Sequence, residues 1–489
     1  MQKRDFAGLP KSRTQSRIDN NLGIISGDSS GGRKIKRWRS DRLHRLDQYF
    51  EGKQYDHLPA WDQAPGMDFI PIRQRRPRIN YKFGQRLANE IAAMLFGTKR
   101  FPRLYVEGDS DMSTYLTMML KASKLQSKMV DLARHLVVCG SAFLRFFFVE
   151  NGLSLEVYSA KHCYPKLDAL GNLEEIEVMY TYKDEADVDD KGNAIEKWVK
   201  IYLSKDVDIL FDNPPFDSKV EPVFEEVNRT EHGLGFVQGE WLRINEKVND
   251  LDGDSLLDDV LDFIDELNYN LSQSSQAIAY NQEPQATFSG MDVNEIEALI
   301  RSSQKGWDLG RDGKAAFLES NLGAVKTADE FRDRARLAIQ DITRIIMLDP
   351  EKMSGHAQSG KAMENLMAPM VNLIEELRPA VETRIVSIIS KLAFINLMII
   401  DLGAEAPVMI PPGWQPSSWN VIAEWPPVYN QTMADLSEKV RVATTVSGAS
   451  LVSRDTLTRW LARDFGIEDI EAELERIAIQ PVINPFAAF

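Results

Sequence analysis

One glycine-rich segment of the chain has the spacing of a phosphate-binding motif. The pattern G-x-x-x-x-G-K is matched by Gly355-His-Ala-Gln-Ser-Gly360-Lys361, and in such loops backbone N–H groups and the lysine hold the phosphates. Hydrolysis also needs a Ser or Thr hydroxyl on Mg²⁺ at the next position, which here is Ala362. The residues before the motif have helical rather than strand periodicity. The sequence therefore favours a Gly/Ser loop ahead of a helix over a nucleotide site.

Two further segments contain residues that bind metals in other proteins. The acidic run Asp250-Leu-Asp-Gly-Asp254 resembles a calcium loop, but the sixth and twelfth positions are Ser255 and Leu261 instead of Gly and Glu. It favours an acidic turn at a helix N-terminus, with an opportunistic cation as the open alternative. His162-Cys163 has no second ligand pair at a usual spacing. We predict no metal site, no cofactor and no catalytic residue.

Composition places the chain among ordinary multidomain proteins of mixed structure. It has 489 residues, of which 43% are hydrophobic and 27% charged. Two cysteines exclude a disulfide framework, and Cys139, in an apolar run, is predicted to be a buried thiol. The most apolar stretch, 385–400, contains Lys391 and Asn396 and is shorter than a membrane span. We therefore expect no contact with a membrane.

Charge is unevenly distributed along the chain. The net charge is −15, yet residues 1–50 hold 12 Lys/Arg and 5 Asp/Glu. An acidic chain is a poor general DNA binder, because affinity for the phosphate backbone comes from basic contacts. Residues 1–46 are predicted to form a flexible basic arm, since 27–32 has linker composition. Its cations flank Trp38 and either bind nucleic acid or begin a solvated helix: Arg33, Lys34, Lys36, Arg37 and Arg39.

Hydrophobic periodicity predicts an α+β first half. Helices are expected over 80–100 and 112–138, where apolar residues recur at helical spacing. Strands are then expected over five segments, the first two forming a hairpin: 142–149, 153–158, 176–182, 198–203 and 208–211.

The second half is predicted to be mainly helical. One helix carries an apolar stripe formed by Leu257, Val260, Leu261, Ile264, Leu267 and Leu271. Thr327 and Glu330 form a capping box that should open a second helix, whose apolar face comprises Phe331, Ala335, Ala338, Ile339, Ile342 and Ile346. After a polar loop, a helix over 362–401 contains Pro369 and Pro379 and should be kinked there. A strand at 419–425 and helices over 431–480 follow.

The order of these elements, together with five short segments, resembles the portal proteins of long-tailed bacteriophages over residues 45–480. The segments are Tyr49-Phe-Glu-Gly52, the helix from Arg78-Ile-Asn80 to Phe96-Gly97, Val138-Cys-Gly140-Ser-Ala-Phe143, Gly253-Asp-Ser255 and Ser359-Gly360-Lys-Ala362. The resemblance implies a multidomain portal-like subunit. About twelve such subunits would close into a ring at one capsid vertex, with DNA passing through the central channel.

The resemblance also implies a domain layout. Residues 47–254 and 362–428 would form a sheet-rich wing, and helices 255–282 and 328–347 a stem. The remaining parts would be a clip at 283–327, a tunnel loop at 348–361 and a helical crown at 429–489.

Partners and site residues are implied in the same way. The clip would meet the terminase and later the head-completion adaptor, through Arg301, Lys305, Trp307, Arg311 and Lys314. The tunnel loop would face double-stranded DNA, through Lys352, Ser354, Gly355, His356, Gln358, Ser359, Gly360 and Lys361. Major capsid and scaffolding proteins would be further partners, with assembly in the host cytoplasm and a final place in the virion. The rival interpretations are a phosphate-loop motor using Lys361 and a DNA-binding protein acting through residues 33–39.

Overall fold

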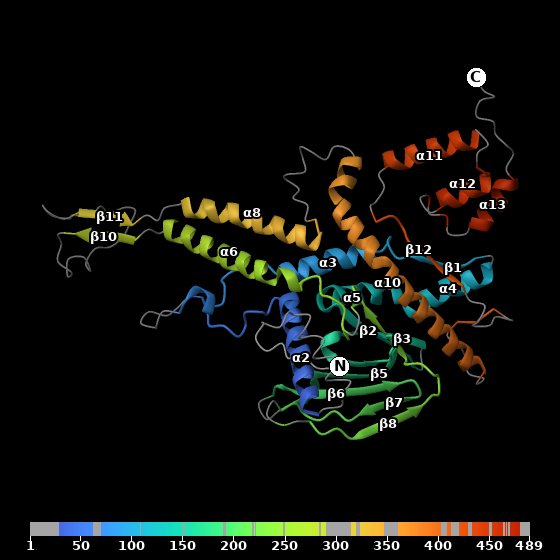
Figure 1. Ribbon diagram of the computed structural model, residues 1–489, viewed down its shortest axis with the longest axis horizontal. Coiled ribbons are helices and arrows are strands. Elements are labelled where there is room, and N and C mark those ends of the chain that lie inside the picture. The colour runs from blue at the N-terminus through green and yellow to red at the C-terminus, as the bar shows by residue number, and fades with distance from the viewer. Residues whose placement is uncertain are drawn as a thin grey trace, which may run out of the picture. The chain divides into compact units, whose positions relative to one another are not determined.

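The computed structural model of the chain forms two compact units (Figure 1). Unit 1 comprises Met1–Ile345 and Leu373–Pro426, and unit 2 comprises Ile346–Asn372 and Pro427–Phe489. The structure describes all residues except 1–28, 62–69, 108, 150–151, 189–191, 218–219, 221, 248–249, 283–284, 290–313, 319–322, 347–359, 402–407, 412–419, 429–432, 449–451, 463–464, 466, 468–469 and 480–489.

The described part of unit 1 begins with α2 (Ser29–Glu51), followed by the short helix η1 (Ile72–Gln74), α3 (Phe83–Phe96), α4 (Ser110–Ser123) and α5 (Leu125–Cys139). The helix predicted over 80–100 is confirmed as α3, whose apolar face is buried. The single helix predicted over 112–138 is wrong, because the chain is divided at Lys124. That residue has a left-handed φ of 52° and ends α4, while the Asp109 carboxylate caps its start.

Helix α2 differs from the flexible arm that the composition predicts. It runs through the predicted boundary at residue 46, and Leu43 and Leu46 are fully buried. The glycines at 31 and 32 lie within its first turn. Apolar residues every three to four positions from Leu43 onward give the helix a face that packs on α3 and α5.

A three-stranded antiparallel sheet follows the helices, in the order β3-β2-β9. Its strands are β2 (Ser141–Val149), β3 (Gly152–Ser159) and β9 (Gly239–Arg243). The predicted hairpin is confirmed, with Phe143 opposite Tyr158 on β3 and Trp241 on β9. Strand β9 was not predicted. It is buried at every position, but it contains Glu240 and Arg243, so its sequence lacks the apolar pattern of a buried strand.

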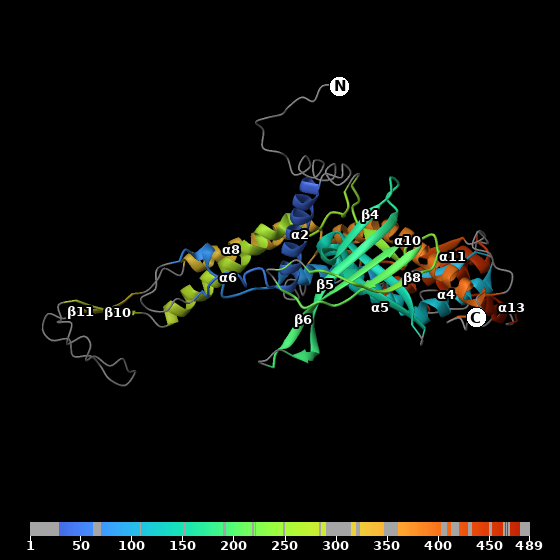
Figure 2. The same cartoon turned by 90° about the horizontal axis from the view of Figure 1, so that it is seen from below.

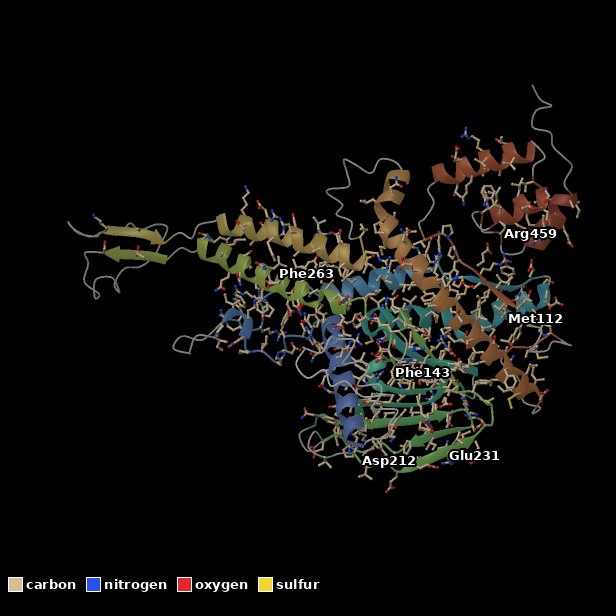
Figure 3. The ribbon with its side chains drawn as sticks, viewed as in Figure 1. Met112, Phe143, Asp212, Glu231, Phe263 and Arg459 are labelled. Carbon is tan, nitrogen blue, oxygen red and sulfur yellow. The ribbon has the colours of Figure 1, made fainter. Side chains whose placement is uncertain are left out.

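The second sheet has five antiparallel strands in sequence order. They are β4 (Cys163–Leu167), β5 (Leu173–Val188), β6 (Ala194–Ser204), β7 (Val207–Phe211) and β8 (Glu226–Glu231). The three strands predicted here are confirmed within β5, β6 and β7. Strand β8 is exposed at every position and polar except for Val227, so it has no burial pattern to detect. Figure 3 shows Asp212 and Glu231 at this outer edge, away from Phe143 in the interior.

Two helices form a long hairpin in unit 1 (Figure 1). Helix α6 (Leu261–Gln282) follows the short helix η3 (Asp258–Val260), and α8 (Gly323–Thr343) packs along it. Between them β10 (Gln285–Ser289) pairs antiparallel with β11 (Lys314–Leu318). The predicted capping box is wrong, because α8 begins at Gly323 and Thr327 lies inside the helix.

Helix α10 (Gly360–Asp401) is continuous through both of its prolines, so their kinks remain a prediction. Its residues from Leu373 onward line the core of unit 1, with Met112, Tyr115, Met119, Ala393 and Val408 forming one cluster. Strands β1 (Arg103–Val106) and β12 (Val421–Glu424) pair nearby, which confirms a strand within 419–425.

Helix α10 also contains a segment, Asn365–Asp401, that is long and apolar enough to cross a membrane by length and composition. The sequence pattern indicated only the shorter apolar stretch 385–400 within it. The segment's polar side chains have partners in the protein: Arg384 lies 3.1 Å and Lys391 2.5 Å from the buried Glu240 carboxylate. Such contacts are those of a core helix.

Unit 2 contains α11 (Met433–Gly448), α12 (Arg454–Ala462) and α13 (Ile470–Ile479), in agreement with the helices predicted over 431–480. Ala443 and Ala462 are buried, and Lys439 lies 6.0 Å from the Trp460 ring centroid. Figure 3 labels Arg459 on α12, where it pairs with Asp455.

Candidate assembly and docking site at the α6–α8 hairpin

Residues 49–61 and 70–81, which we call the collar, contact the base of α6. The collar's first contact is a half-buried carboxylate: Asp265 accepts hydrogen bonds from the Tyr49 and Tyr55 hydroxyls at 2.7 and 2.6 Å. Burial raises the pKa of Asp265, against the opposing effect of the two hydroxyl donors. The collar thus begins with a polar group that depends on both tyrosines to stay satisfied.

A polar stripe continues along the same face of α6. Asn268 accepts from the Tyr81 N–H at 2.9 Å, and Ser272 accepts from the Ile79 N–H at 2.9 Å. One turn further, Gln276 accepts from the Trp61 indole at 2.9 Å. Positions 265, 268, 272 and 276 recur every three to four residues, so they share one helix face. The collar therefore contacts α6 through hydrogen bonds as well as through apolar packing.

Aromatic rings fill the space beside these hydrogen bonds. Tyr55, Trp61 and Tyr269 form a buried cluster. The Tyr269 hydroxyl donates to the Arg75 carbonyl at 2.9 Å, and the Arg75 guanidinium lies 4.9 Å from the Trp61 ring centroid. The three rings exclude water from one side of the stripe, which strengthens its hydrogen bonds.

A second support lies just before α6, where two glycine backbones cross. A Cβ at Gly140 would lie 2.1 Å from the Gly253 carbonyl oxygen, and one at Gly253 would lie 2.0 Å from the Ile244 oxygen. The Gly253 N–H donates to the Ser141 hydroxyl at 2.9 Å. No larger residue fits at either glycine, so the crossing fixes the point from which the chain enters α6.

Acidic residues of the run 250–254 form ion pairs beside the glycine crossing. The Asp252 carboxylate accepts from the Arg39 guanidinium at 2.6 and 2.8 Å, and Asp254 pairs with Lys247. Among the residues that the structure describes, no group of three or more His, Cys, Asp or Glu is arranged to hold a metal ion. Cys139 and Cys163 are free and buried, and burial raises the pKa of Cys139 to about 12.

The prediction that Arg39 belongs to a flexible basic arm is wrong. Arg39 is buried, and it also donates to the Cys163 carbonyl at 2.7 Å. Burial alone would lower its pKa, but Asp252 outweighs this effect and the pKa is raised. A guanidinium with these partners is part of the fold and is not free to bind nucleic acid. The other predicted arm residues lie in α2, and their side chains are outside the description: Arg33, Lys34, Lys36 and Arg37.

Four of the segments that carry the family resemblance meet at this base. Tyr49 contacts Asp265, and the Asn80 amide donates to the Gly52 carbonyl at 2.7 Å. Gly140 crosses Gly253. Sequence reasoning placed these segments in order but could not bring them together, because each bond joins residues far apart in the chain. Their shared place shows that they position α6.

Helix α8 is organised differently from α6. Ala335 and Ile339 are buried, but Phe331, Leu337 and Ile342 are 42%, 58% and 46% exposed. Phe331 and Ile342 are about three turns apart and therefore share a face. The predicted apolar stripe is thus divided between a buried and an exposed part, because α6 covers only one side of α8.

The end of α8 is fixed to α10 by an exposed ion pair. Arg344 follows the helix with a left-handed φ of 60°, and it donates to both carboxylate oxygens of Glu376 at 2.8 and 2.7 Å.

Most of the predicted docking residues lie outside the described part of the chain. This holds for Arg301, Lys305, Trp307 and Arg311 of the predicted clip and for Lys352, Ser354, Gly355, His356, Gln358 and Ser359 of the predicted tunnel loop. Lys314 is exposed at the start of β11. Gly360 and Lys361 are the first residues of α10, and their side chains are not described.

The chain belongs to the family described as phage portal protein, SPP1 Gp6-like, whose model matches residues 34–480. Proteins of this family are structural components of the portal vertex, and this chain has that structural role. No curated protein matches the chain in sequence.

Solved structures with a similar backbone come from gene transfer agent particles. One is titled "Virion of native gene transfer agent (GTA) particle", with 12% identity, 91% of this chain and 98% of that chain covered, and a TM-score of 0.42. Another is titled "Neck of native GTA particle computed with C12 symmetry", with 12% identity, 79% and 95% covered, and a TM-score of 0.38. Because both TM-scores are below 0.5, only the family model supports the assignment of this chain to the portal family.

Proposed function

We propose that this chain assembles head to tail into a closed ring of about twelve subunits that forms the DNA channel of a capsid vertex. The observation that carries the proposal is the exposed apolar face of α8. Phe331 and Ile342 share this face and are exposed in the described part of the chain, and Leu337 is exposed on another side of the same helix. A neighbouring copy packed along the hairpin would bury them, and repetition of that contact closes a ring.

The regions of the subunit follow the layout that the family resemblance implies. Helices α6 and α8 would supply the stem (255–282 and 328–347), with the clip at 283–327 and the tunnel loop at 348–361. The two sheets, α3, α5 and α10 would be the wing, and α11 to α13 the crown. The collar would then fix the angle between wing and stem.

The ring would act as a conduit rather than as a DNA-binding protein. Each copy carries a net charge of −15, and tight phosphate contacts would stall DNA that must slide. The few cations of the tunnel loop, Lys352, His356 and Lys361, would provide weak contacts. Lys352→Ala/Lys361→Ala should leave ring assembly intact and change DNA packaging or retention, whereas loss of assembly would place the loop in the subunit interface.

The clip would dock the terminase during packaging and the head-completion adaptor afterwards. Trp307, with Arg301, Lys305, Arg311 and Lys314 near it in sequence, has the composition of a binding hot spot. Trp307→Ala should weaken binding of at least one of these partners while the thermal stability of the ring stays unchanged. Full binding of both partners by the variant would remove Trp307 from the docking surface. The crown would face the capsid interior, with scaffolding and major capsid proteins as further contacts in the virion.

The purified ring should not hydrolyse ATP. Ala362 has no hydroxyl for Mg²⁺, and Gly360 and Lys361 begin a helix. Ala362→Ser should not create activity, because a phosphate-loop site also needs a preceding strand and a glycine-rich loop, which one hydroxyl does not supply. ATP turnover that is lost in Lys361→Ala would favour a motor over a portal.

The decisive test is the mass and symmetry of the purified full chain. Light scattering should give a mass near twelve times 55.5 kDa, and negative-stain images should show rings with a central channel. A monomer at all concentrations, with a salt-sensitive DNA complex, would instead favour the DNA-binding alternative.

A further inference from the structure

Strands β5 and β6 extend beyond the five-stranded sheet as a two-stranded ribbon, which we call the β5–β6 ribbon (residues 180–188 and 194–200). Strand β4 pairs with β5 only as far as Val178, and β7 pairs with β6 only as far as Ile201. Beyond these points β5 and β6 continue to pair with each other up to Val188 opposite Ala194. Residues 214–216 lie along the β6 side of the ribbon, where the Trp198 N–H donates to the Pro214 carbonyl at 2.9 Å and the Phe216 N–H donates to the Glu196 carbonyl at 2.7 Å. Among the described residues, only the end of the ribbon, 183–188 and 194–195, is therefore two-stranded. A two-stranded ribbon has marginal stability in water, so a further contact would stabilise this end.

The ribbon is acidic and has an apolar residue near its end. Residues 183–197 contain six Asp/Glu and three Lys. One of these lysines, Lys197, is already engaged, at 2.9 Å from both Asp184 and Asp187. Glu185 is exposed, and Val188 is 54% exposed. The surface that the ribbon offers is therefore negative with a small apolar centre.

The beginning of helix α2 and the end of the ribbon project from opposite sides of unit 1. In Figure 1 the described start of α2 and the end of the ribbon lie close together at the lower edge of the unit. In Figure 2 the same two features extend to opposite sides. They are therefore separated mainly along the viewing direction of Figure 1. A second copy displaced along that direction would bring its α2 to the ribbon of the first.

The beginning of α2 has the opposite charge. Residues 29–38 of this helix contain Arg33, Lys34, Lys36 and Arg37 and no acidic residue. Most of the chain is acidic, so copies of it repel one another, and a contact between copies gains from pairing a basic segment with an acidic one. Two different patches on opposite sides are also what a head-to-tail ring interface requires.

We propose that the β5–β6 ribbon of one subunit docks on the beginning of α2 in the next copy of this chain. The contact rests on the ring assembly proposed above and adds a second point of attachment between neighbours, apart from α8. Its partner is a second copy rather than DNA, because the acidic ribbon repels phosphate.

The test is a charge-reversal cycle in the full chain. Glu185→Lys/Asp187→Lys reverses two negative charges of the ribbon, and Lys34→Glu/Lys36→Glu reverses two positive charges at the beginning of α2. The matched control is Glu226→Lys/Glu231→Lys, which makes the same charge change on exposed acidic residues of edge strand β8. The protein concentration for half-assembly is measured by light scattering at about 0.15 M salt, where charges more than roughly 8 Å apart are screened.

Each reversed pair should raise the half-assembly concentration about tenfold or more, equivalent to roughly 1.4 kcal/mol. The control should stay within about threefold of wild type, and the combined variant carrying both reversed pairs should return to that range. Such recovery cannot come from a ribbon that has unfolded.

Three outcomes would overturn the contact. Either reversed pair could assemble as the control does, or the combined variant could stay as poor as the weaker parent. Lys34→Glu/Lys36→Glu could also alter DNA retention while assembly is unchanged, which would make α2 a DNA surface. A wild-type chain that forms no ring would instead overturn the proposed function itself, before the variants are compared.

Discussion

The two helices of one hairpin, α6 and α8, are stabilised in opposite ways. Along α6, a polar stripe is satisfied by the collar and an apolar stripe is buried by the rest of unit 1. Along α8, one face packs on α6 while Phe331, Leu337 and Ile342 remain exposed. In the described part of the chain, α6 is covered along most of its length and exposes Ile278 near its end, whereas α8 exposes Phe331, Leu337 and Ile342.

This difference separates folding from assembly within one hairpin. Residues that hold α6 should affect the stability of the isolated subunit, because their partners are all internal. Residues on the open face of α8 should affect only the association of subunits, because an exposed apolar side chain contributes nothing until another surface covers it. Variants of the two helices can therefore test whether α6 contacts affect folding and α8 contacts affect assembly.

The largest effect is expected on the open face of α8. Phe331→Asp/Ile342→Asp should raise the concentration for ring assembly at least about 100-fold, because burial of each large side chain contributes roughly 1.5–3 kcal/mol. The circular dichroism spectrum and melting temperature of the subunit should not change. Gln273→Asp/Gln282→Asp makes the same charge change on exposed residues of α6 and should leave assembly close to wild type. Equal effects of the two pairs would mean that α8 is not the apolar interface.

The next effect concerns the glycine crossing at the entry to α6. Gly140→Ala should destabilise the subunit by about 3 kcal/mol or more, because its φ is 79° and the new Cβ meets the Gly253 backbone. Gly192→Ala is the matched control: its φ is 80°, but nothing lies within 4 Å. It should cost only about 1–2 kcal/mol of backbone strain. Thermal unfolding of both variants measures the difference, and equal losses would show that the crossing tolerates a methyl group.

A smaller effect is expected at the collar carboxylate. Asp265→Ala leaves two largely buried tyrosine hydroxyls without their acceptor and should cost about 2–4 kcal/mol. Asp265→Asn keeps an acceptor oxygen and should cost less.

The pH dependence of this group has a defined sign. Burial raises the pKa of Asp265 in the folded chain, so the folded state holds its proton more tightly than the unfolded state. The stability that this group contributes is present below the unfolded pKa and is lost as the pH rises through the folded pKa. The stability of wild type relative to Asp265→Asn should therefore fall with rising pH across that window. A difference that rises with pH would mean that the folded pKa is lowered.

The smallest effect is expected at the end of α8. Arg344→Gly removes the exposed ion pair with Glu376 but relieves the left-handed φ of 60°. The two changes oppose each other, and exposed pairs contribute about 0–1 kcal/mol, so stability should stay within about 1 kcal/mol of wild type. A double-mutant cycle with Glu376→Gln measures the pair alone. A coupling well above 1 kcal/mol would give α8 a strong internal anchor and weaken its contrast with α6.

Local patterns were sufficient for the long elements of the fold. The apolar stripe from Leu257 to Leu271 predicted α6, and the alternation at 142–158 predicted the β2–β3 hairpin. Both patterns are produced by burial of one face of a regular element. Strand β8 and the division at Lys124 were missed, because a fully exposed strand has no such pattern and a left-handed lysine has no sequence signature.

Long-range partners explain the remaining errors. Arg39 has the sequence context of a solvated arm, but its carboxylate partner is 213 residues away. Phe331 and Ala335 belong to the same predicted stripe, and only the position of α6 decides that one is exposed and the other buried.

The sequence by itself determined the order of elements, the acidic charge and the family to which the chain belongs, because periodicity, composition and short signatures are local properties. Only the tertiary structure decided what those signatures do. It brought Tyr49, Asn80, Gly140 and Gly253 to the base of α6 and left one face of α8 open. The physical reason is that a hydrogen bond or a close backbone contact depends on distance in space, and separation along the chain carries no information about it.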